Sequence, residues 1–353
     1  MKRELAPDAG YTGYLRFKKL FLLGMVLLTA AIALVAIACG SAGLTVGTVV
    51  RTLLGGGDQN ARIIVWNLRL PRMVTAVVAG TGLAAVGCVM QSILRNPLAS
   101  SSTLGVSQGA AFGAAFAIIV LNAGMQSQTL DGVSFSNPYA ISVCAFVGSM
   151  LSTLVMLGLS RISKITPQTM ILAGVALSSL FSGGTTLLQY FADDVKVAAV
   201  VFWTFGSLSS TSWREIAIMA AVVAGALLYF LRHRWSYNAL QSGEATAKGL
   251  GVHTDRLLLG SMVVCSLTAS VIVSYIGIIN FIGLIAPHLM RRVIGSDYRY
   301  LLPASALMGA VLLLLSDTVA RLAVAPVVLP IGAITSFLGA PLFLYLVFKG
   351  GKR

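Results

Sequence analysis

The stretch PRMVTAVVAGTGLAAVGCVMQSIL, residues 71–94, decides the fold of this chain. After Arg72 it continues without another charged residue as far as Leu94. At a rise of about 1.5 Å per residue, a helix of this length crosses the roughly 30 Å hydrocarbon core of a bilayer. Ala76, Gly80 and Ala84 recur four positions apart, so they share one helix face and predict close contact with another helix. The stretch is therefore expected to be a packed membrane-spanning helix.

The composition extends this interpretation to the whole chain. Of 353 residues, 57% are hydrophobic and 10% are charged, and the mean hydropathy is +0.89. These values are typical of an integral membrane protein. The net charge of +14 does not indicate nucleic-acid binding, because the basic residues lie between apolar runs and form no single patch with interleaved aromatic residues.

Apolar runs of about spanning length recur along the chain and predict an all-α fold with about ten transmembrane helices. The runs cover residues 20–40, 71–94, 104–122, 139–160, 169–191, 214–231, 257–279, 280–290, 303–323 and 331–348. The run at 280–290 is too short to cross alone and needs shielding by protein. Residues 195–208 predict a short helix lying partly in the membrane at the outer mouth. We expect one transmembrane domain over residues 1–353.

A second small-residue pattern, Gly105, Gly109 and Gly113, predicts another close helix contact. The distribution of basic residues predicts the orientation. With the N-terminus inside, all but seven of the 25 lysines and arginines lie on the inner side. Residues 1–19, the loop at 232–256 and both termini are then cytosolic. The seven that would face outward are Arg51, Arg62, Arg69, Arg72, Lys196, Arg214 and Arg321.

The longest inner polar stretch that still has a helical pattern is SYNALQSGEATAKGLGVH, residues 236–253. Ser242 can cap a helix of two turns, Glu244 lies in its first turn, Lys248 follows at i+4, and Gly249 can end it. Such a short helix needs a surface to pack on. The apolar contacts would come from Ala245, Ala247, Leu250 and Val252. The stretch is either a docking surface or an ordinary loop between spans.

The residues that catalysis or ion coupling would need are scarce. Of the 11 acidic residues, only Asp317 lies well inside a predicted span, which argues against proton coupling. Asp317 and Arg321 are four apart, so they form either a local ion pair or a functional pair. The chain contains no phosphate-binding loop and no catalytic or metal-binding motif. We expect no enzyme activity, cofactor or metal, and any ATP must bind another chain.

The chain resembles, over nearly its whole length, the membrane subunits of type II ABC importers that carry iron-siderophores, haem and cobalamin. The resemblance rests on motifs distributed from the second span to the last. These are Arg69-Leu-Pro-Arg72, Gln91, Arg95-Asn-Pro-Leu-Ala99, Leu104-Gly-Val-Ser107, Leu172-Ala-Gly-Val-Ala176, Gly243-Glu244, Gly249-Leu-Gly251, Phe281-Ile-Gly-Leu-Ile-Ala-Pro-His288, Arg291, Asp317, Ala320-Arg321, Leu329-Pro-Ile-Gly332 and Gly339-Ala-Pro341.

This resemblance implies a pore formed by two copies of the chain, or by the chain and a related permease. It also implies two cytosolic ATPase subunits that bind Mg and ATP, and an extracytoplasmic substrate-binding protein. The implied ATPase-coupling residues are Ser242, Gly243, Glu244, Ala245, Lys248, Gly249, Leu250 and Gly251. The implied inner gate comprises Asn96, Pro97 and Leu98 with Thr166, Pro167 and Gln168, where Pro167 departs from the polar residue expected. Arg69, Arg72 and Arg321 would receive acidic residues of the binding protein.

The expected function is import of an iron chelate, either a siderophore or haem, or of cobalamin, through a prokaryotic cytoplasmic (inner) membrane. The alternative is a secondary transporter or channel that works alone. Arg69 and Arg72 could instead anchor the chain at the membrane interface beside Trp66. A copurifying ATPase would distinguish the importer from a protein that works alone.

Overall fold

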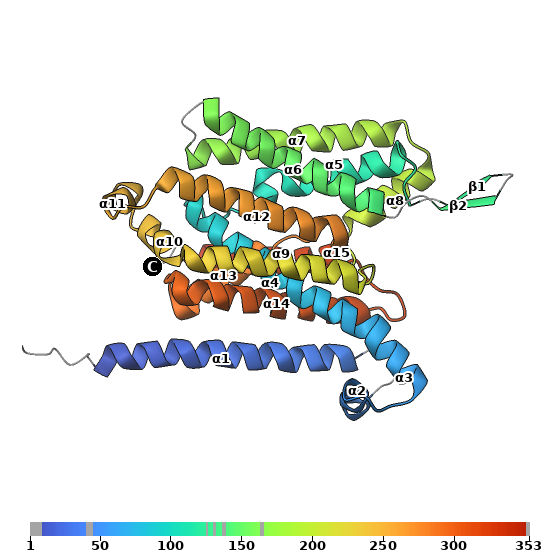
Figure 1. Ribbon diagram of the computed structural model, residues 1–353, viewed down its shortest axis with the longest axis horizontal. Coiled ribbons are helices and arrows are strands. Elements are labelled where there is room, and N and C mark those ends of the chain that lie inside the picture. Colours follow the sequence, from blue (N-terminus) through green and yellow to red (C-terminus); the bar gives the residue numbers. More distant parts are fainter. Residues whose placement is uncertain are drawn as a thin grey trace, which may run out of the picture.

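Long helices lie side by side along one direction and give the molecule two distinct ends (Figure 1). The computed structural model describes residues 9–39, 45–124, 126–129, 132–135, 139–162 and 166–350. Helix α11 and the C-terminus lie at one end, which we call the inner end, and α2, α3 and the β1–β2 hairpin lie at the other, the outer end. Residues 1–8 of the predicted N-terminal segment lie outside the described residues.

The first half of the chain contains the elements α1 (Ala9–Ala38), α2 (Val46–Leu53), α3 (Gln59–Ile63), the π-helix η1 (Ile64–Arg69), α4 (Leu70–Ile93), the 3₁₀ helix η2 (Ser101–Leu104), α5 (Val106–Ile119), β1 (Gln126–Thr129), β2 (Gly132–Phe135) and α6 (Tyr139–Ile162). The second half contains α7 (Pro167–Tyr190), α8 (Asp194–Thr204), α9 (Trp213–Arg232), α10 (Arg234–Gln241), α11 (Glu244–Gly249), α12 (Thr254–Ile276), α13 (Ile282–Ile294), α14 (Tyr298–Leu322) and α15 (Ile331–Gly350).

The predicted all-α membrane fold is confirmed. In the part of the chain that the structure describes, seven helices are long and apolar enough to cross a membrane, and α5 and α15 contain shorter apolar segments. Helix α13 corresponds to the short run at 280–290 and packs against α4, α14 and α15, which provides the protein shielding expected for it. Helix α8 lies where the short outer helix was predicted.

The structure differs from the sequence prediction in three places. No helix was predicted between the first two spans, but α2, α3 and η1 extend helical structure out to Val46. A two-stranded antiparallel hairpin, β1–β2, interrupts the all-α pattern between α5 and α6. Helix α1 begins at Ala9, so Lys18 is helical and 4% exposed. Its Nζ lies 4.3 Å from the ring centre of Tyr14 and 5.0 Å from that of Tyr300, which compensates the buried charge.

Helix α4 is the central helix and packs against α14, α13, α12 and α9. The predicted small-residue contact is confirmed, because Gly80 faces the backbone of α14. A Cβ at Gly80 would overlap the carbonyl oxygen of Gly309 and lie 2.9 Å from Ala310 Cα. About two turns further along, a Cβ at Gly87 would lie 2.6 Å from Gly283 Cα. The absence of side chains at these positions lets the helix backbones touch.

The second predicted contact face is confirmed at Gly109 and Gly113, whereas Gly105 precedes α5 with φ +80° and is not part of the helix. A Cβ at Gly109 would lie 3.2 Å from Ser149 Cα, and one at Gly113 would lie 2.6 Å from the carbonyl carbon of Cys144. Helices α5 and α6 therefore touch through their backbones. Two closely packed groups of helices result, one around α4 and one around α5.

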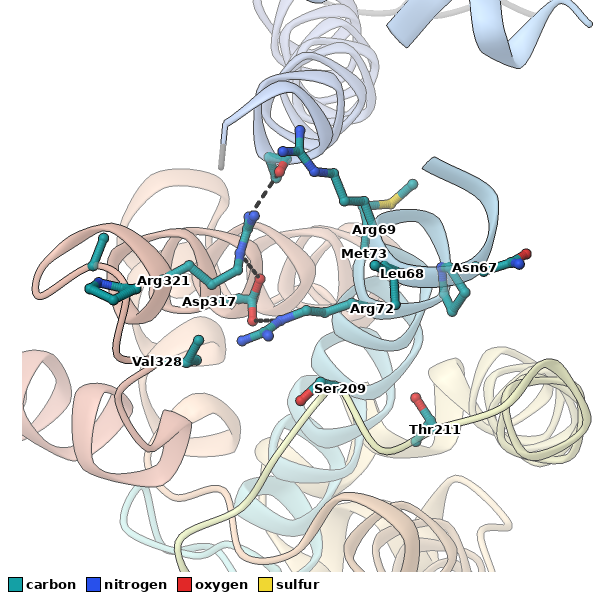
Figure 2. Close-up of a pocket in the computed structure, with 14 residues that line it drawn as sticks. Asn67, Leu68, Arg69, Arg72, Met73, Ser209, Thr211, Asp317, Arg321 and Val328 are labelled. Atoms are coloured by element: carbon teal, nitrogen blue, oxygen red, sulfur yellow. Dashed lines mark hydrogen bonds and ion pairs between the residues drawn. The ribbon is translucent and has the colours of Figure 1, made fainter. Parts of the chain in front are cut away.

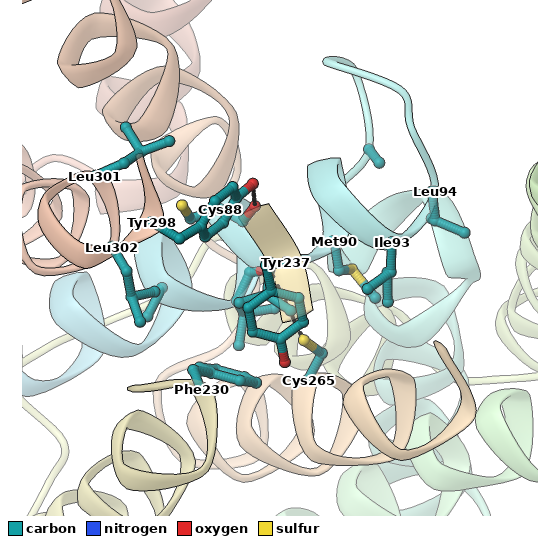
Figure 3. Packing of buried hydrophobic residues seen from close by; sticks show 14 of the residues in the cluster. Cys88, Met90, Ile93, Leu94, Phe230, Tyr237, Cys265, Tyr298, Leu301 and Leu302 are labelled. Atoms are coloured by element: carbon teal, nitrogen blue, oxygen red, sulfur yellow. Dashed lines mark hydrogen bonds between the residues drawn. The ribbon is translucent and has the colours of Figure 1, made fainter. Parts of the chain in front are cut away.

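Large aromatic side chains fill the core near the inner end (Figure 3). Tyr237 of α10 and Tyr298 of α14 are nearly fully buried, with ring centres 5.6 Å apart. The Tyr237 hydroxyl hydrogen-bonds to Ser261 Oγ at 2.7 Å, and the Tyr298 hydroxyl donates to the carbonyl oxygen of Cys88 at 2.9 Å. Each polar atom is thus satisfied, and α10 is fixed to the helix bundle.

Candidate functional site

The inner polar stretch folds into two short helices, so the predicted single helix capped by Ser242 is wrong in its details. Ser242 follows the last residue of α10, and α11 starts at Glu244. Gly243 precedes α11 with φ +110°, a conformation that suits glycine and introduces a sharp turn. Because of this turn, Ser242 ends α10 and does not cap α11. Gly249 is the last residue of α11, and Gly251 adopts φ +82° beyond it.

The surface of α11 is only partly covered. Ala247 is fully buried and Val252 packs at the edge of the core, as predicted. Ala245 is exposed, and Leu250 is 69% exposed. The apolar set therefore divides into residues that hold α11 on the bundle and residues that remain available to another surface.

Glu244 forms two ion pairs in different directions. Its Oε1 lies 2.8 Å from Lys248 Nζ on the same helix, and its Oε2 lies 3.5 Å from Arg95 Nη2 beyond the end of α4. The hydrogen bond and charge of Lys248, together with the charge of Arg95, lower the pKa of Glu244. Glu244 is therefore ionised at neutral pH. The pair with Lys248 matches the predicted i+4 spacing, whereas the sequence analysis missed the pair with Arg95.

Helix α10 is attached to the turn between α13 and α14. Asn238 Nδ2 donates to Asp297 Oδ1 at 2.9 Å, and the Tyr298 backbone N–H donates to Asn238 Oδ1 at 2.8 Å. Gln241 also donates to the carbonyl oxygen of Ser296. Burial raises the pKa of Asp297, but hydrogen bonds from Arg299 and Asn238 outweigh this effect and lower the pKa to about 2. These contacts fix the direction from which α11 leaves the bundle.

The two predicted gate turns begin at the ends of helices. In the first, the Leu98 backbone N–H donates to Asn96 Oδ1 at 2.8 Å, and the Leu98 side chain is 47% exposed. In the second, Thr166 Oγ1 accepts from the Thr169 N–H, and Pro167 is the first residue of α7. Proline suits this position because it has no N–H and its φ is already helical, which accounts for the unexpected residue. Gln168 is exposed.

The three arginines predicted to dock the binding protein cluster at the outer end, from three segments of the chain (Figure 2). Asp317 is 2% exposed and accepts from Arg72 Nε at 2.7 Å and from Arg321 Nε at 3.0 Å. Arg321 also donates to the carbonyl oxygens of Ala36 and Cys39, at 2.8 Å each. The expected local pair of Asp317 and Arg321 is therefore confirmed, with Arg72 as a second partner.

Arg69 completes this cluster without contacting Asp317. Its Nη1 donates to the carbonyl oxygens of Ile37 and Ala38, at 2.6 and 2.9 Å. Arg69 and Arg321 therefore cap the carboxyl end of α1, where carbonyl groups lack helical partners and the helix dipole attracts cations. A cavity of about 280 Å³ lies against the cluster and is lined by Arg69, Arg72, Arg321, Asp317, Ser209 and Thr211 among others. With three guanidinium groups and one carboxylate, the cavity suits an incoming anion.

The contact of Arg72 with Asp317 was missed because 245 positions separate the two residues. A usable signal was present, since Arg72 and Arg321, four residues after Asp317, were both predicted to face outward, and Arg72 and Asp317 carry opposite charges. Within the described ranges, no group of three or more His, Cys, Asp or Glu side chains is placed to hold a metal ion.

The fold and the site define a class: a multi-pass membrane protein with a short, partly exposed helix, α11, at one end and a cluster of basic residues at the other. Comparison with known proteins identifies the family. A model of the FecCD transport family matches residues 27–349, and the chain therefore belongs to this family.

The relatives agree with this assignment. The chain is 52% identical to a Methanocaldococcus jannaschii protein that carries the provisional name of an ABC transporter permease, over 95% of this chain and 97% of that one. It is 36% identical to the hemin transport system permease protein of Yersinia pestis, over 90% and 93% of the two chains. A solved structure provisionally assigned to a metal-chelate type ABC transporter, in an inward-facing conformation, superposes with a TM-score of 0.81 at 31% identity, covering 93% of this chain and 99% of that one.

Proposed function

We propose that this chain is the membrane-spanning subunit of an ATP-driven importer that carries an iron chelate, either a siderophore or haem, or cobalamin. The observation that carries the proposal is membership of a family whose named members include hemin, Fe(3+)-citrate and vitamin B12 import permeases. It is supported by the position of α11 at the end of the bundle opposite to α3 (Figure 1), which is followed by η1 and α4 with Arg69 and Arg72. The protein would lie in a prokaryotic cytoplasmic membrane with both termini in the cytosol.

In this proposal, two copies of the chain, or the chain and a related permease, enclose the pathway, and two cytosolic ATPase subunits bind beneath α11. Leu250 and Ala245 expose apolar surface there, and Glu244 and Lys248 provide charge beside it. The turns at Asn96–Leu98 and Thr166–Gln168 close the inner gate. Alternating access follows when ATP binding shifts the helix groups relative to each other.

At the outer end, the arginine cluster receives carboxylates of a substrate-binding protein. Arg69 is suited to this role, because its contacts with α1 use Nη1 and leave Nε and Nη2 for a carboxylate. Arg72 and Arg321 already share Asp317, so they raise the positive charge around the cavity and hold its wall in place. Charge complementarity of this kind speeds encounter and fixes register.

The test is reconstitution of the permease with the ATPase and binding protein encoded beside it. Individual siderophores, haem and cobalamin are added in turn, and ATP hydrolysis and uptake into liposomes are measured. We expect one chelate to stimulate both. Uptake that proceeds without ATP and without any ATPase subunit would instead show a secondary transporter or channel.

A further inference from the structure

Arg95 occupies a backbone conformation that a residue with a side chain rarely adopts. It follows the last residues of α4 and has φ +46°, in the left-handed region where helices usually place glycine. Its backbone N–H still closes the helix end by donating to the carbonyl oxygen of Ser92. Glycine would satisfy the same geometry with less strain, so the closing of the helix does not explain an arginine here.

The side chain of Arg95 connects two parts of the inner end. Its Nη2 lies 3.5 Å from Glu244 Oε2 at the start of α11. The next residue, Asn96, begins the turn in which the Leu98 N–H binds Asn96 Oδ1. This short internal bond makes residues 96–98 a compact unit that follows Arg95. The ion pair therefore joins the coupling helix directly to the predicted gate turn.

The contribution of this ion pair to stability is small, because the side chains of Arg95 and Glu244 are 40% and 44% exposed. Glu244 is also held by Lys248, whose ion pair stays within α11 and cannot transmit movement to the gate turn. Helix α10 is fixed to the bundle through Tyr237 and Asn238, whereas α11 lies beyond it and exposes Leu250. Besides the packing of Ala247, the Glu244–Arg95 pair is therefore a polar contact that joins α11 to the end of α4.

We propose that Arg95 is a positioning residue that couples α11 to the Asn96–Leu98 gate turn through its ion pair with Glu244. This inference rests on the proposed function. When an ATPase subunit moves α11, Glu244 draws Arg95 with it and shifts Leu98 relative to its counterpart in the second copy.

The test uses the complete transporter in liposomes with cysteine at Leu98, and measures cross-linking between copies with and without ATP and vanadate. Arg95→Gln removes the charge, and Arg95→Lys keeps it. Arg16→Gln is the matched control, because Arg16 is an exposed arginine at the inner end of α1. The number of ATPase subunits that copurify with each permease is measured in parallel. Because Arg95 lies outside α11, its substitution should leave this number unchanged.

We expect Arg95→Gln to recover the same amount of ATPase as the parent but to reduce the ATP-dependent change in Leu98 cross-linking by about twofold to fivefold, the range that an exposed ion pair supplies. Arg95→Lys restores most of the change, and Arg16→Gln behaves like the parent. An unchanged response in Arg95→Gln, with the parent responding, overturns this inference alone. A parent that recovers no ATPase overturns the proposed function as well.

Discussion

Replacing Asp317 with leucine tests whether the outer arginine cluster is a charge-balanced unit. Asp317 is 2% exposed, and the side chains of both Arg72 and Arg321 are 14% exposed. The substitution removes two charge-assisted hydrogen bonds, each contributing about 1.5–3 kcal/mol, and leaves two guanidinium groups without their carboxylate. The adjacent cavity of about 280 Å³ admits water, which recovers part of this loss. We expect the free energy of unfolding to fall by about 2–4 kcal/mol.

Two further variants separate charge from packing. Arg72→Met leaves Asp317 paired with Arg321 at 3.0 Å, so we expect a smaller loss of about 1–2 kcal/mol. The double variant, Arg72→Met with Asp317→Leu, leaves Arg321 but not Arg72 as a guanidinium group that has lost its carboxylate. Its cost should be below the sum of the single costs by at least about 0.5 kcal/mol, because the two residues share one interaction.

The assay is equilibrium unfolding of the purified permease in detergent, followed by tryptophan fluorescence, with Asp317→Asn as the matched control that keeps an acceptor oxygen. Asp317→Asn should lie between the parent and Asp317→Leu. Stability of Asp317→Leu within about 0.5 kcal/mol of the parent would refute the reasoning, and so would strictly additive single and double variants.

Four other outcomes follow from the structure. Gly80→Ala forces a Cβ against the α14 backbone and should destabilise the chain by about 1–3 kcal/mol in the same assay. Gly225→Ala, where a Cβ would meet no atom within 4 Å, should be neutral or slightly stabilising. Equal stability of the two variants would contradict the close contact. The pKa of Asp297 is lowered from 3.8 to about 2, so its carboxylate stabilises the fold by about 1 kcal/mol after a discount for partial exposure. This stabilisation is present above about pH 4 and is lost as the pH falls toward 2. Melting scans from pH 5 to 2.5 should therefore show less acid sensitivity in Asp297→Asn than in the parent. Glu244→Arg should insert normally but lose uptake in liposomes, and parental uptake and hydrolysis would show that α11 is not the docking helix. Arg69→Glu should weaken the affinity for the binding protein, most strongly at low salt, and changing a matching carboxylate of the binding protein to lysine should partly restore it. A loss of membrane insertion without any rescue would instead favour anchoring of Arg69 at the membrane interface.

The membrane helices were predictable because their signal is local. An apolar run of spanning length requires a helix in lipid, where every backbone N–H and C=O must be satisfied within the segment. The Gly80 and Gly113 faces were predictable for the same reason, since a spacing of four residues already defines one side of a helix. Polar segments carry no such requirement. The helical extension before Leu70 and the separation of α10 from α11 depend on the surfaces they contact.

The polar contacts of the candidate site illustrate the limit more sharply. The pairs Asp317–Arg321 and Glu244–Lys248 were predictable, because both lie at i+4 on one helix. Arg72 with Asp317 and Arg95 with Glu244 were not, because each joins segments that only the packing of α4 brings together. In each case the local partner was found and the distant partner was missed.

Both distant partners belong to one helix, which relates the two ends of the molecule. Arg72 lies in the first turn of α4, and Arg95 lies just beyond its last turn. The helix has 24 residues and is therefore about 36 Å long. Its backbone touches α14 at Gly80 and α13 at Gly87, so bending at these points would require the helix backbones to separate. This close packing against α13 and α14 therefore opposes bending of α4 between its two ends. Arg72 of the outer cluster and the turn at Asn96–Leu98 are thus attached to opposite ends of one closely packed helix.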